Sequence, residues 1–122
     1  MNTLNDGGLT LHCHDPAPGV IRVQWLGRSD ARFPGEALNP YLSQVLAQAH
    51  AAAAAVEMHF EDLEYLNSST ISVVMHFLAT AREARVPLSF TYQPKVRWQK
   101  LSFEALRVFE HLDKQIRVVA LQ

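Results

Sequence analysis

The residues of this chain best suited to chemistry at a single point are Ser68, Ser69 and Thr70, which directly follow Asn67. Their hydroxyl groups can accept a phosphoryl group, and an apolar helix-like run begins next to them at Ile71. Asn, Ser and Thr also cap helices, because their side-chain oxygens accept free backbone N–H groups. The stretch therefore allows two interpretations, an ordinary helix cap and a phosphorylation switch at a helix N-terminus.

The sequence around Ser68 does not support catalysis. No Gly-x-Ser-x-Gly motif surrounds the serine, and the chain has no glycine-rich phosphate-binding loop. His12, Cys13 and His14 resemble a metal site by type, but in a strand Cys13 faces away from both histidines. Zinc would need further converging ligands. We therefore predict no enzyme activity, no catalytic residues, no metal and no cofactor.

Composition and charge limit the classes of partner. The chain has 122 residues, 48% hydrophobic and 19% charged, which is typical of one globular domain. A net charge of −1 argues against nucleic-acid binding, and no apolar run approaches the ~20 residues of a membrane span. The single cysteine, Cys13, fits a reducing compartment, and the N-terminus lacks a signal-peptide pattern. We expect a cytoplasmic protein with neither nucleic-acid nor membrane partners.

Hydrophobic periodicity predicts the elements that position the hydroxyl cluster. Residues 1–8 are polar and glycine-containing, so we expect a flexible segment before a single domain over 9–122. The predicted helices begin at Asn39-Pro40, near Ser69 and near Lys95. Alternating apolar residues predict the strands, which cover residues 9–14, 20–26, 56–60, 88–92 and 116–121.

The resulting order is β-β-α-β-α-β-α-β. Helices between successive strands imply parallel crossovers, and the opening hairpin adds antiparallel strands at one edge. The fold class is therefore α/β, with a mixed sheet and helices packed mainly on one face. Asn67-Ser68-Ser69-Thr70 lies where the second helix begins, and its apolar stripe is predicted to include Ile71, Val74 and Met75.

This order, with a strand, then Asn67-Ser68-Ser69-Thr70, an apolar helix and a later Pro94-Lys95-Val96-Arg97 helix start, resembles the STAS family of anti-sigma-factor antagonists. The resemblance covers about residues 20–119. The corresponding family segment commonly reads Asp-Ser-Ser-Gly, and a partner kinase phosphorylates its first serine. Ser68 matches that serine, while Asn67 replaces the Asp and Thr70 replaces the Gly.

The resemblance implies a non-enzymatic regulator in a partner-switching signalling system. Ser68 would be the phosphorylation site, with Ser69 as the second candidate. The implied partners are a serine/threonine kinase of anti-sigma type and a PP2C-like phosphatase. Partner contacts are expected from Asn67 to Ile71 (Asn67, Ser68, Ser69, Thr70 and Ile71) and from Asp30, which follows the second strand.

Two alternatives stay open. Tyr65-Leu66-Asn67-Ser68-Ser69 is also similar to a SiaC-like subgroup of STAS-type regulators, in which the hydroxyl residue after Asn is the switch. In that subgroup a diguanylate cyclase, which makes cyclic di-GMP in biofilm control, is a partner. The other alternative is a STAS-like interaction module that is not phosphorylated, with Asn67 or Ser68 acting only as a helix cap.

Overall fold

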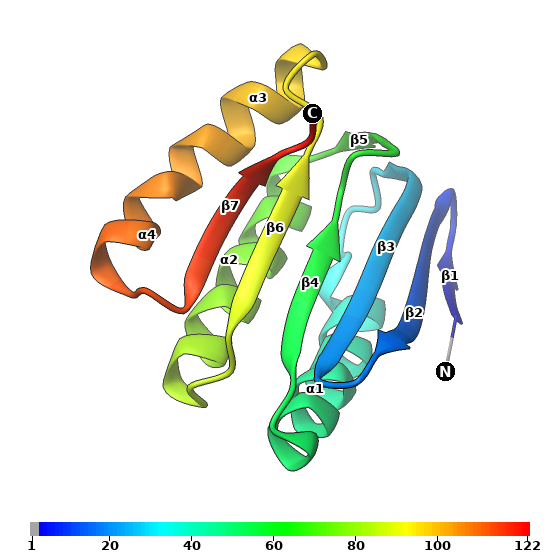
Figure 1. The fold of residues 1–122 in the computed structure, drawn as a ribbon. Helices are drawn as coiled ribbons and strands as arrows, with labels where there is room; N and C mark the ends of the chain where they lie inside the picture. Colours follow the sequence, from blue (N-terminus) through cyan, green and yellow to red (C-terminus); the bar gives the residue numbers. More distant parts are fainter. Residues whose placement is uncertain (1–2) are drawn as a thin grey trace.

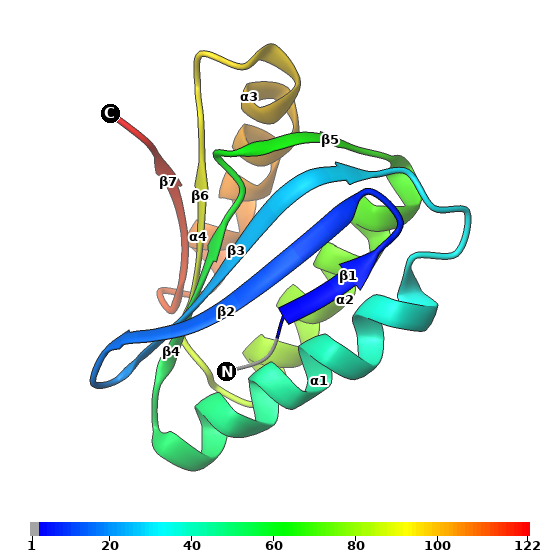
Figure 2. The ribbon, with the colours of Figure 1, turned by 90° about the vertical axis from the view of Figure 1, so that its right-hand side faces the viewer.

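The computed structural model describes residues 3–122 as one mixed β-sheet with helices along one of its faces (Figures 1 and 2). The strands are β1 (Thr3–Asp6), β2 (Leu9–Ala17), β3 (Val20–Ser29), β4 (Ala55–His59), β5 (Leu63–Leu66), β6 (Leu88–Tyr92) and β7 (Ile116–Ala120). The helices are α1 (Gly35–Ala52), α2 (Ser68–Glu83), α3 (Arg97–Glu104) and α4 (Val108–Leu112), with a 3₁₀ turn, η1 (Ala105–Arg107), between the last two.

The sheet has the order β1-β2-β3-β4-β6-β7, and the short β5 pairs with the far end of β3. β1, β2 and β3 are antiparallel neighbours, whereas every other pair is parallel. Figure 2 shows the helices together on one side of this sheet. The predicted fold class, an α/β protein with a mixed sheet and helices mainly on one face, is confirmed.

The core lies between the sheet and the helices. α1 buries Leu38, Leu42, Val45, Leu46 and Ala49, a spacing that forms one stripe on a helix. From the sheet, alternate residues point toward this stripe. Aromatic rings fill the end of the core near β5, where Phe60 lies 4.9 Å from Trp25 and 4.6 Å from Phe103 between ring centroids. Within residues 3–122, no helix is both long and apolar enough to cross a bilayer.

Gly27 lets β3 change partners. Up to Gln24, β3 pairs with β4, and from Gly27 onward it pairs with β5. Gly27 has φ +85°, and a Cβ there would lie 2.1 Å from the carbonyl oxygen of Gly8. Only glycine tolerates both the backbone angle and this close approach. The bend carries β3 as far as Ser29, beside Leu66, where the hydroxyl cluster begins.

Four expectations about the elements are wrong. Residues 3–6 of the segment expected to be flexible form β1, which pairs with β2, while Met1 and Asn2 lie outside the described residues. β5 was not predicted, because a strand from Leu63 to Leu66 is too short to show alternation. α1 begins at Gly35 and contains Pro40, which was expected to start it. The single helix expected to begin near Lys95 is divided by η1 and continues to Leu112.

Side chains of the last helical region are tied to the sheet by polar contacts. Gln99, which is fully buried, accepts a hydrogen bond from the backbone N–H of Gln93 at 2.7 Å. Its amide donates to the carbonyl oxygens of Phe60 at 2.8 Å and Leu63 at 3.0 Å. Further along, Glu110 of α4 accepts a hydrogen bond from the backbone N–H of Val118 at 2.8 Å. These contacts fix α3 and α4 against β4, β6 and β7.

Candidate functional site

The hydroxyl cluster lies at the first turn of α2, immediately after β5 (Figure 2). Asn67 is the N-cap, with extended backbone angles of φ −89° and ψ 174°. Its Oδ1 accepts the backbone N–H of Thr70 at 2.9 Å, which is the usual capping bond. The cap interpretation of Asn67 is therefore confirmed as a structural fact, and it leaves the hydroxyl of Ser68 available for a second role.

Asn67 also connects α2 to the segment between β3 and α1. Its Nδ2 donates to the carbonyl oxygen of Ala31 at 2.9 Å, and its backbone N–H donates to the carbonyl oxygen of Ser29 at 3.0 Å. A carboxylate could not make the first of these bonds, because it has no donor when ionised. The amide at this position thus has a function that the Asp of the STAS pattern cannot supply.

Thr70 completes the same network from inside the protein. Its side chain is fully buried, and its Oγ1 donates to Asn67 Oδ1 at 2.7 Å. Ser29 Oγ lies 2.7 Å from Thr70 Oγ1. Since the only hydroxyl proton of Thr70 is used on Asn67, Ser29 must be the donor in this contact. A glycine at 70 would leave Ser29, which is also buried, without this acceptor.

The two departures from the STAS pattern are therefore parts of one hydrogen-bond network. Asn67 and Thr70 together bind the end of β3 and the start of the following loop to the first turn of α2. Asp30, the exposed residue expected to contact a partner, lies between Ser29 and Ala31, which both take part in this network. The structure thus brings Asp30 and the cluster onto one part of the surface.

The predicted site residues differ in their access to solvent. Ser68 and Ser69 are exposed, and Asn67 is half-buried. Thr70 is fully buried, so its side chain supports the site from within and cannot itself contact a partner. Ile71 was expected in the inward stripe of α2 as well as at the partner surface, and it is 37% exposed. Val73, two residues further along the helix, is buried.

Two backbone donors remain open at the cluster. In the described part of the chain, the N–H groups of Thr70 and Ile71 bond to Asn67, and no described hydrogen bond uses those of Ser68 or Ser69. Such N–H groups at a helix start attract anions, helped by the helix dipole. Ser68 Oγ and these donors belong to the same turn, so a phosphate on Ser68 would stand beside them.

Apolar surface adjoins the cluster on the side of α3. A shallow hollow between α2 and α3 is lined by Leu66, Ile71, Met75 and Phe103, among others. Tyr65, at the end of β5, is 39% exposed, and the guanidinium of Arg28 lies 4.8 Å from its ring centroid. The first turn of α2 therefore presents hydroxyls next to apolar contact area, a combination suited to a protein partner.

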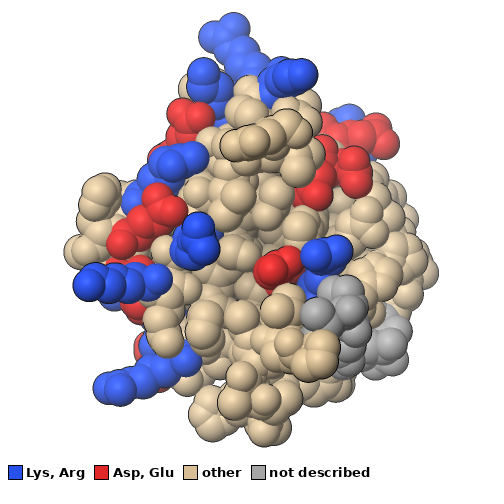
Figure 3. All heavy atoms as spheres, in the orientation of Figure 1, with Lys and Arg blue, Asp and Glu red and all other residues tan. Residues whose placement is uncertain are grey.

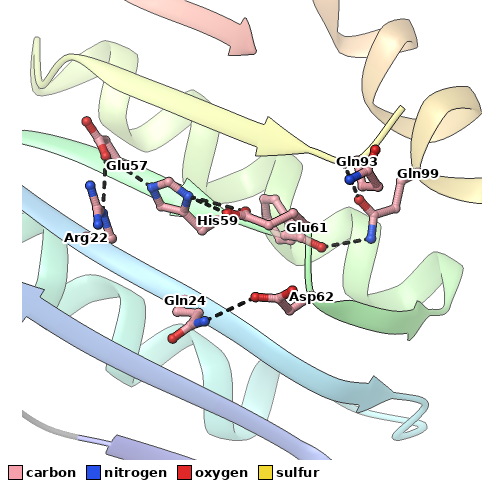
Figure 4. Close-up of polar contacts among 9 residues, drawn as sticks. Arg22, Gln24, Glu57, His59, Glu61, Asp62, Gln93 and Gln99 are labelled. Atoms are coloured by element: carbon pink, nitrogen blue, oxygen red, sulfur yellow. Dashed lines mark hydrogen bonds and ion pairs between the residues drawn. The ribbon is translucent and has the colours of Figure 1, made fainter. Parts of the chain in front are cut away.

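The open face of the sheet carries a separate polar cluster (Figure 4). His59 lies between two carboxylates, with Nε2 3.1 Å from Glu57 and Nδ1 3.1 Å from Glu61, and Arg22 lies 3.5 Å from Glu57. The hydrogen bond to Glu61 raises the pKa of His59 above its ordinary value. Ionised carboxylates only accept, so both contacts are hydrogen bonds when both ring nitrogens carry protons, and the site favours the imidazolium form of His59. Sequence reasoning missed this cluster, although Glu57, His59 and Glu61 alternate along the chain.

The other sequence candidates, His12, Cys13 and His14, lie on β2. His12 and His14 lie 6.0 Å apart between ring centroids, and His12 Nδ1 lies 3.0 Å from Thr3 Oγ1. Cys13 is buried on the opposite face of β2. Among the residues described, no group of three or more His, Cys, Asp or Glu side chains is placed to hold a metal ion.

The burial of Tyr41 and its neighbour Cys13 raise the pKa of Tyr41 to about 12.

The architecture places the chain in a known class, the STAS-like α/β fold. Two solved structures of SpoIIAA share it. The chain is similar to the Bacillus cell fate determinant SpoIIAA in its phosphorylated form, with a TM-score of 0.59, 14% identity and coverage of 89% of this chain and 90% of that one. It is also similar to the anti-sigma factor antagonist SpoIIAA in its unphosphorylated form, with a TM-score of 0.57, 12% identity and coverage of 92% and 87%. No protein-family model and no curated protein matches the chain. Sequence identities this low show a common fold and nothing more. The STAS resemblance is thus confirmed for the fold.

Proposed function

We propose that the chain is a non-enzymatic regulator that binds a protein partner through the first turn of α2, under control of phosphorylation at Ser68. The observation that carries the proposal is that different residues of this turn hold its backbone and face the solvent. Asn67 and Thr70 hold the backbone from within, while Ser68 is exposed and next to two open N–H groups. The likeness to SpoIIAA, which is described in phosphorylated and unphosphorylated forms, supports the same use.

The unmodified chain is the form that binds. A phosphate adds about −1.5 to −2 charges at neutral pH. The N–H groups of the turn accommodate it, so the fold is retained while the surface changes. Exposed Glu64 lies just before the turn, and a partner that covers apolar Ile71 and the hollow beside it would have to desolvate the added negative charge. Phosphorylation therefore releases the partner, and a phosphatase of PP2C type restores binding.

The experiment uses the purified chain with an anti-sigma-type serine kinase and ATP, followed by mass spectrometry of the phosphopeptide. We expect phosphate on Ser68, with Ser69 as the second candidate, and loss of labelling in Ser68→Ala. Ser69→Ala is the matched control, because it removes an equally exposed hydroxyl one residue away. Partner capture should succeed with Ser68→Ala and fail with Ser68→Asp. Equal capture by both variants would contradict the switch and leave an interaction module that is not phosphorylated.

A second candidate is a SiaC-like regulator of a diguanylate cyclase. The observation in its favour is the bond from Asn67 Nδ2 to the carbonyl of Ala31, which uses the amide that the SiaC-like motif has and the Asp-Ser-Ser-Gly motif lacks. The two candidates differ in partner and share the switch at Ser68. Binding of the unphosphorylated chain to a diguanylate cyclase, with a change in cyclic di-GMP synthesis, would favour the second. Both place the protein in the cytoplasm.

A further inference from the structure

His12 and His14 of β2 lie side by side on the open face of the sheet. They are two residues apart in a strand, so their side chains share a face, opposite to that of buried Cys13. Their ring centroids are 6.0 Å apart and the ring planes are inclined by 40°. His12 is half-buried and His14 is exposed. Figure 3 shows this face of the molecule, most of which is tan and therefore free of charged side chains.

Thr3 orients one of the two rings. Its Oγ1 lies 3.0 Å from Nδ1 of His12, the residue with which it pairs between β1 and β2. When Nδ1 carries the proton, it donates to this oxygen and the lone pair is on Nε2. Histidines that bind metals are usually oriented in this way, by a hydrogen bond from the other ring nitrogen. Among the described residues, no hydrogen bond uses Nε2 of His12 or either ring nitrogen of His14.

We propose that His12 and His14 chelate one divalent transition-metal ion, copper(II) or zinc, whose remaining positions are filled by water. Imidazole nitrogen is a suitable ligand for both metals. Two such nitrogens at about 2.0–2.1 Å from one ion bring the ring centroids to about 5 Å, so the rings approach by about 1 Å on binding. His14 makes most of this movement, because its ring is exposed whereas that of His12 is held by Thr3.

The neighbouring side chains of β3 are compatible with a bound cation. Arg22 is paired with His14 in the register, but its guanidinium lies 3.5 Å from the carboxylate of Glu57, which offsets its charge. Gln24 is paired with the other histidine and donates its amide nitrogen to Asp62 at 3.3 Å. Figure 4 shows the amide oxygen of Gln24 turned away from that contact. This oxygen is therefore available to accept a hydrogen bond from a water bound to the metal.

This site differs from the closed zinc site that the sequence predicted to be absent. A closed site needs three or four protein ligands, and no group of described side chains supplies them. The pair of imidazoles instead forms an open site, which binds less tightly than a closed one because protein supplies only two ligands. Nitrogen ligands of this kind favour copper(II) over zinc. None of the residues involved belongs to the first turn of α2, so the metal site is independent of the proposed switch.

Isothermal titration calorimetry of the full chain with copper(II) chloride and with zinc chloride tests the proposal. We expect one ion per chain, with copper(II) bound more tightly than zinc. His12→Gln and His14→Gln should each weaken copper(II) binding about tenfold or more, and the double variant should lose much less than the product of the two single losses, because either change already breaks the chelate. His14→Gln keeps the contact between Thr3 and His12, so its effect does not arise from loosening of β1. Circular dichroism checks that each variant is folded.

His76→Gln is the matched control, because His76 is also an exposed histidine and lies on α2, away from β2. It should bind copper(II) like the wild type. In NMR spectra, zinc should shift the imidazole signals of His12 and His14 most. A wild type that binds no copper(II) at about 1 mM would overturn the proposal. So would a loss of binding in only one of the two single variants, which would indicate a single imidazole ligand, or zinc-induced shifts centred on His59.

Discussion

Replacing Asn67 with Asp separates the two roles of this side chain. Asp caps helices as well as Asn does, and its charge interacts favourably with the helix dipole. Capping alone therefore predicts that Asn67→Asp is neutral or stabilising. The bond from Asn67 Nδ2 to the carbonyl oxygen of Ala31, 2.9 Å long, predicts the reverse, because the substitution places a carboxylate oxygen against a carbonyl oxygen.

The magnitude follows from these opposing effects. Loss of the hydrogen bond, with the Ala31 carbonyl left facing an anion, costs about 1–3 kcal/mol. The favourable interaction of the new carboxylate with the helix dipole offsets about 0.3–1 kcal/mol of this loss. We expect a net loss of about 1–2 kcal/mol in the free energy of unfolding at neutral pH. With a urea m-value of about 2 kcal/mol/M, the midpoint falls by about 0.5–1 M.

Urea unfolding followed by tryptophan fluorescence measures this change, because Trp25 is fully buried and reports loss of the core. Asn67→Ala is the control that removes the cap as well, which adds a loss of about 0.5–2 kcal/mol. The expected order of stability is wild type, then Asn67→Asp, then Asn67→Ala. An Asn67→Asp variant at least as stable as the wild type would refute the role of the amide in binding the loop.

Three further predictions concern other parts of the structure and use the same urea assay. The pKa of His59 is raised above its ordinary value of 6.5, mainly by the hydrogen bond to Glu61. The protonated side chain therefore stabilises the fold below pH 6.5, and this contribution to the free energy of unfolding is lost as the pH rises through the raised pKa. Over that pH range the free energy of unfolding of the wild type should fall by up to about 1 kcal/mol relative to that of His59→Gln. Unfolding free energies that change with pH in the same way in both proteins would contradict this. Gln99→Leu leaves buried backbone groups unpaired and should cost about 3 kcal/mol, so a loss under about 1 kcal/mol would be inconsistent with the three bonds. Gly27→Ala should destabilise far more than Gly19→Ala, since both have φ near +85° and only at Gly27 would the new Cβ meet backbone. Equal losses would show that the backbone angle alone matters.

The order of helices and long strands was predictable from periodicity, because each buries one regular face. α2 illustrates this, since Asn67 and the apolar run after it locate its start within one residue. β1 and β5 were not predictable in the same way. Each has four residues, and β1 is held by pairing with β2 rather than by an apolar face of its own.

The candidate site was predictable in position and less so in its internal contacts. Ser68 and Ser69 are exposed at a helix start, as their type and spacing suggested. The partners of Asn67 and Thr70 come from Ser29 and Ala31, more than thirty residues away, and only the bend at Gly27 brings them there. Gln99 gave no signal either, since a single glutamine in a polar stretch does not reveal three backbone partners.

The bond between Glu110 and the backbone N–H of Val118 has a consequence for aggregation. β7 is the outermost strand at its end of the sheet, so its outward N–H groups are a template on which another chain could add a strand. Glu110 occupies the donor at the centre of β7 with a carboxylate, which also repels an incoming carbonyl oxygen. The side chain thus disfavours the addition of a strand from another molecule at this edge of the sheet.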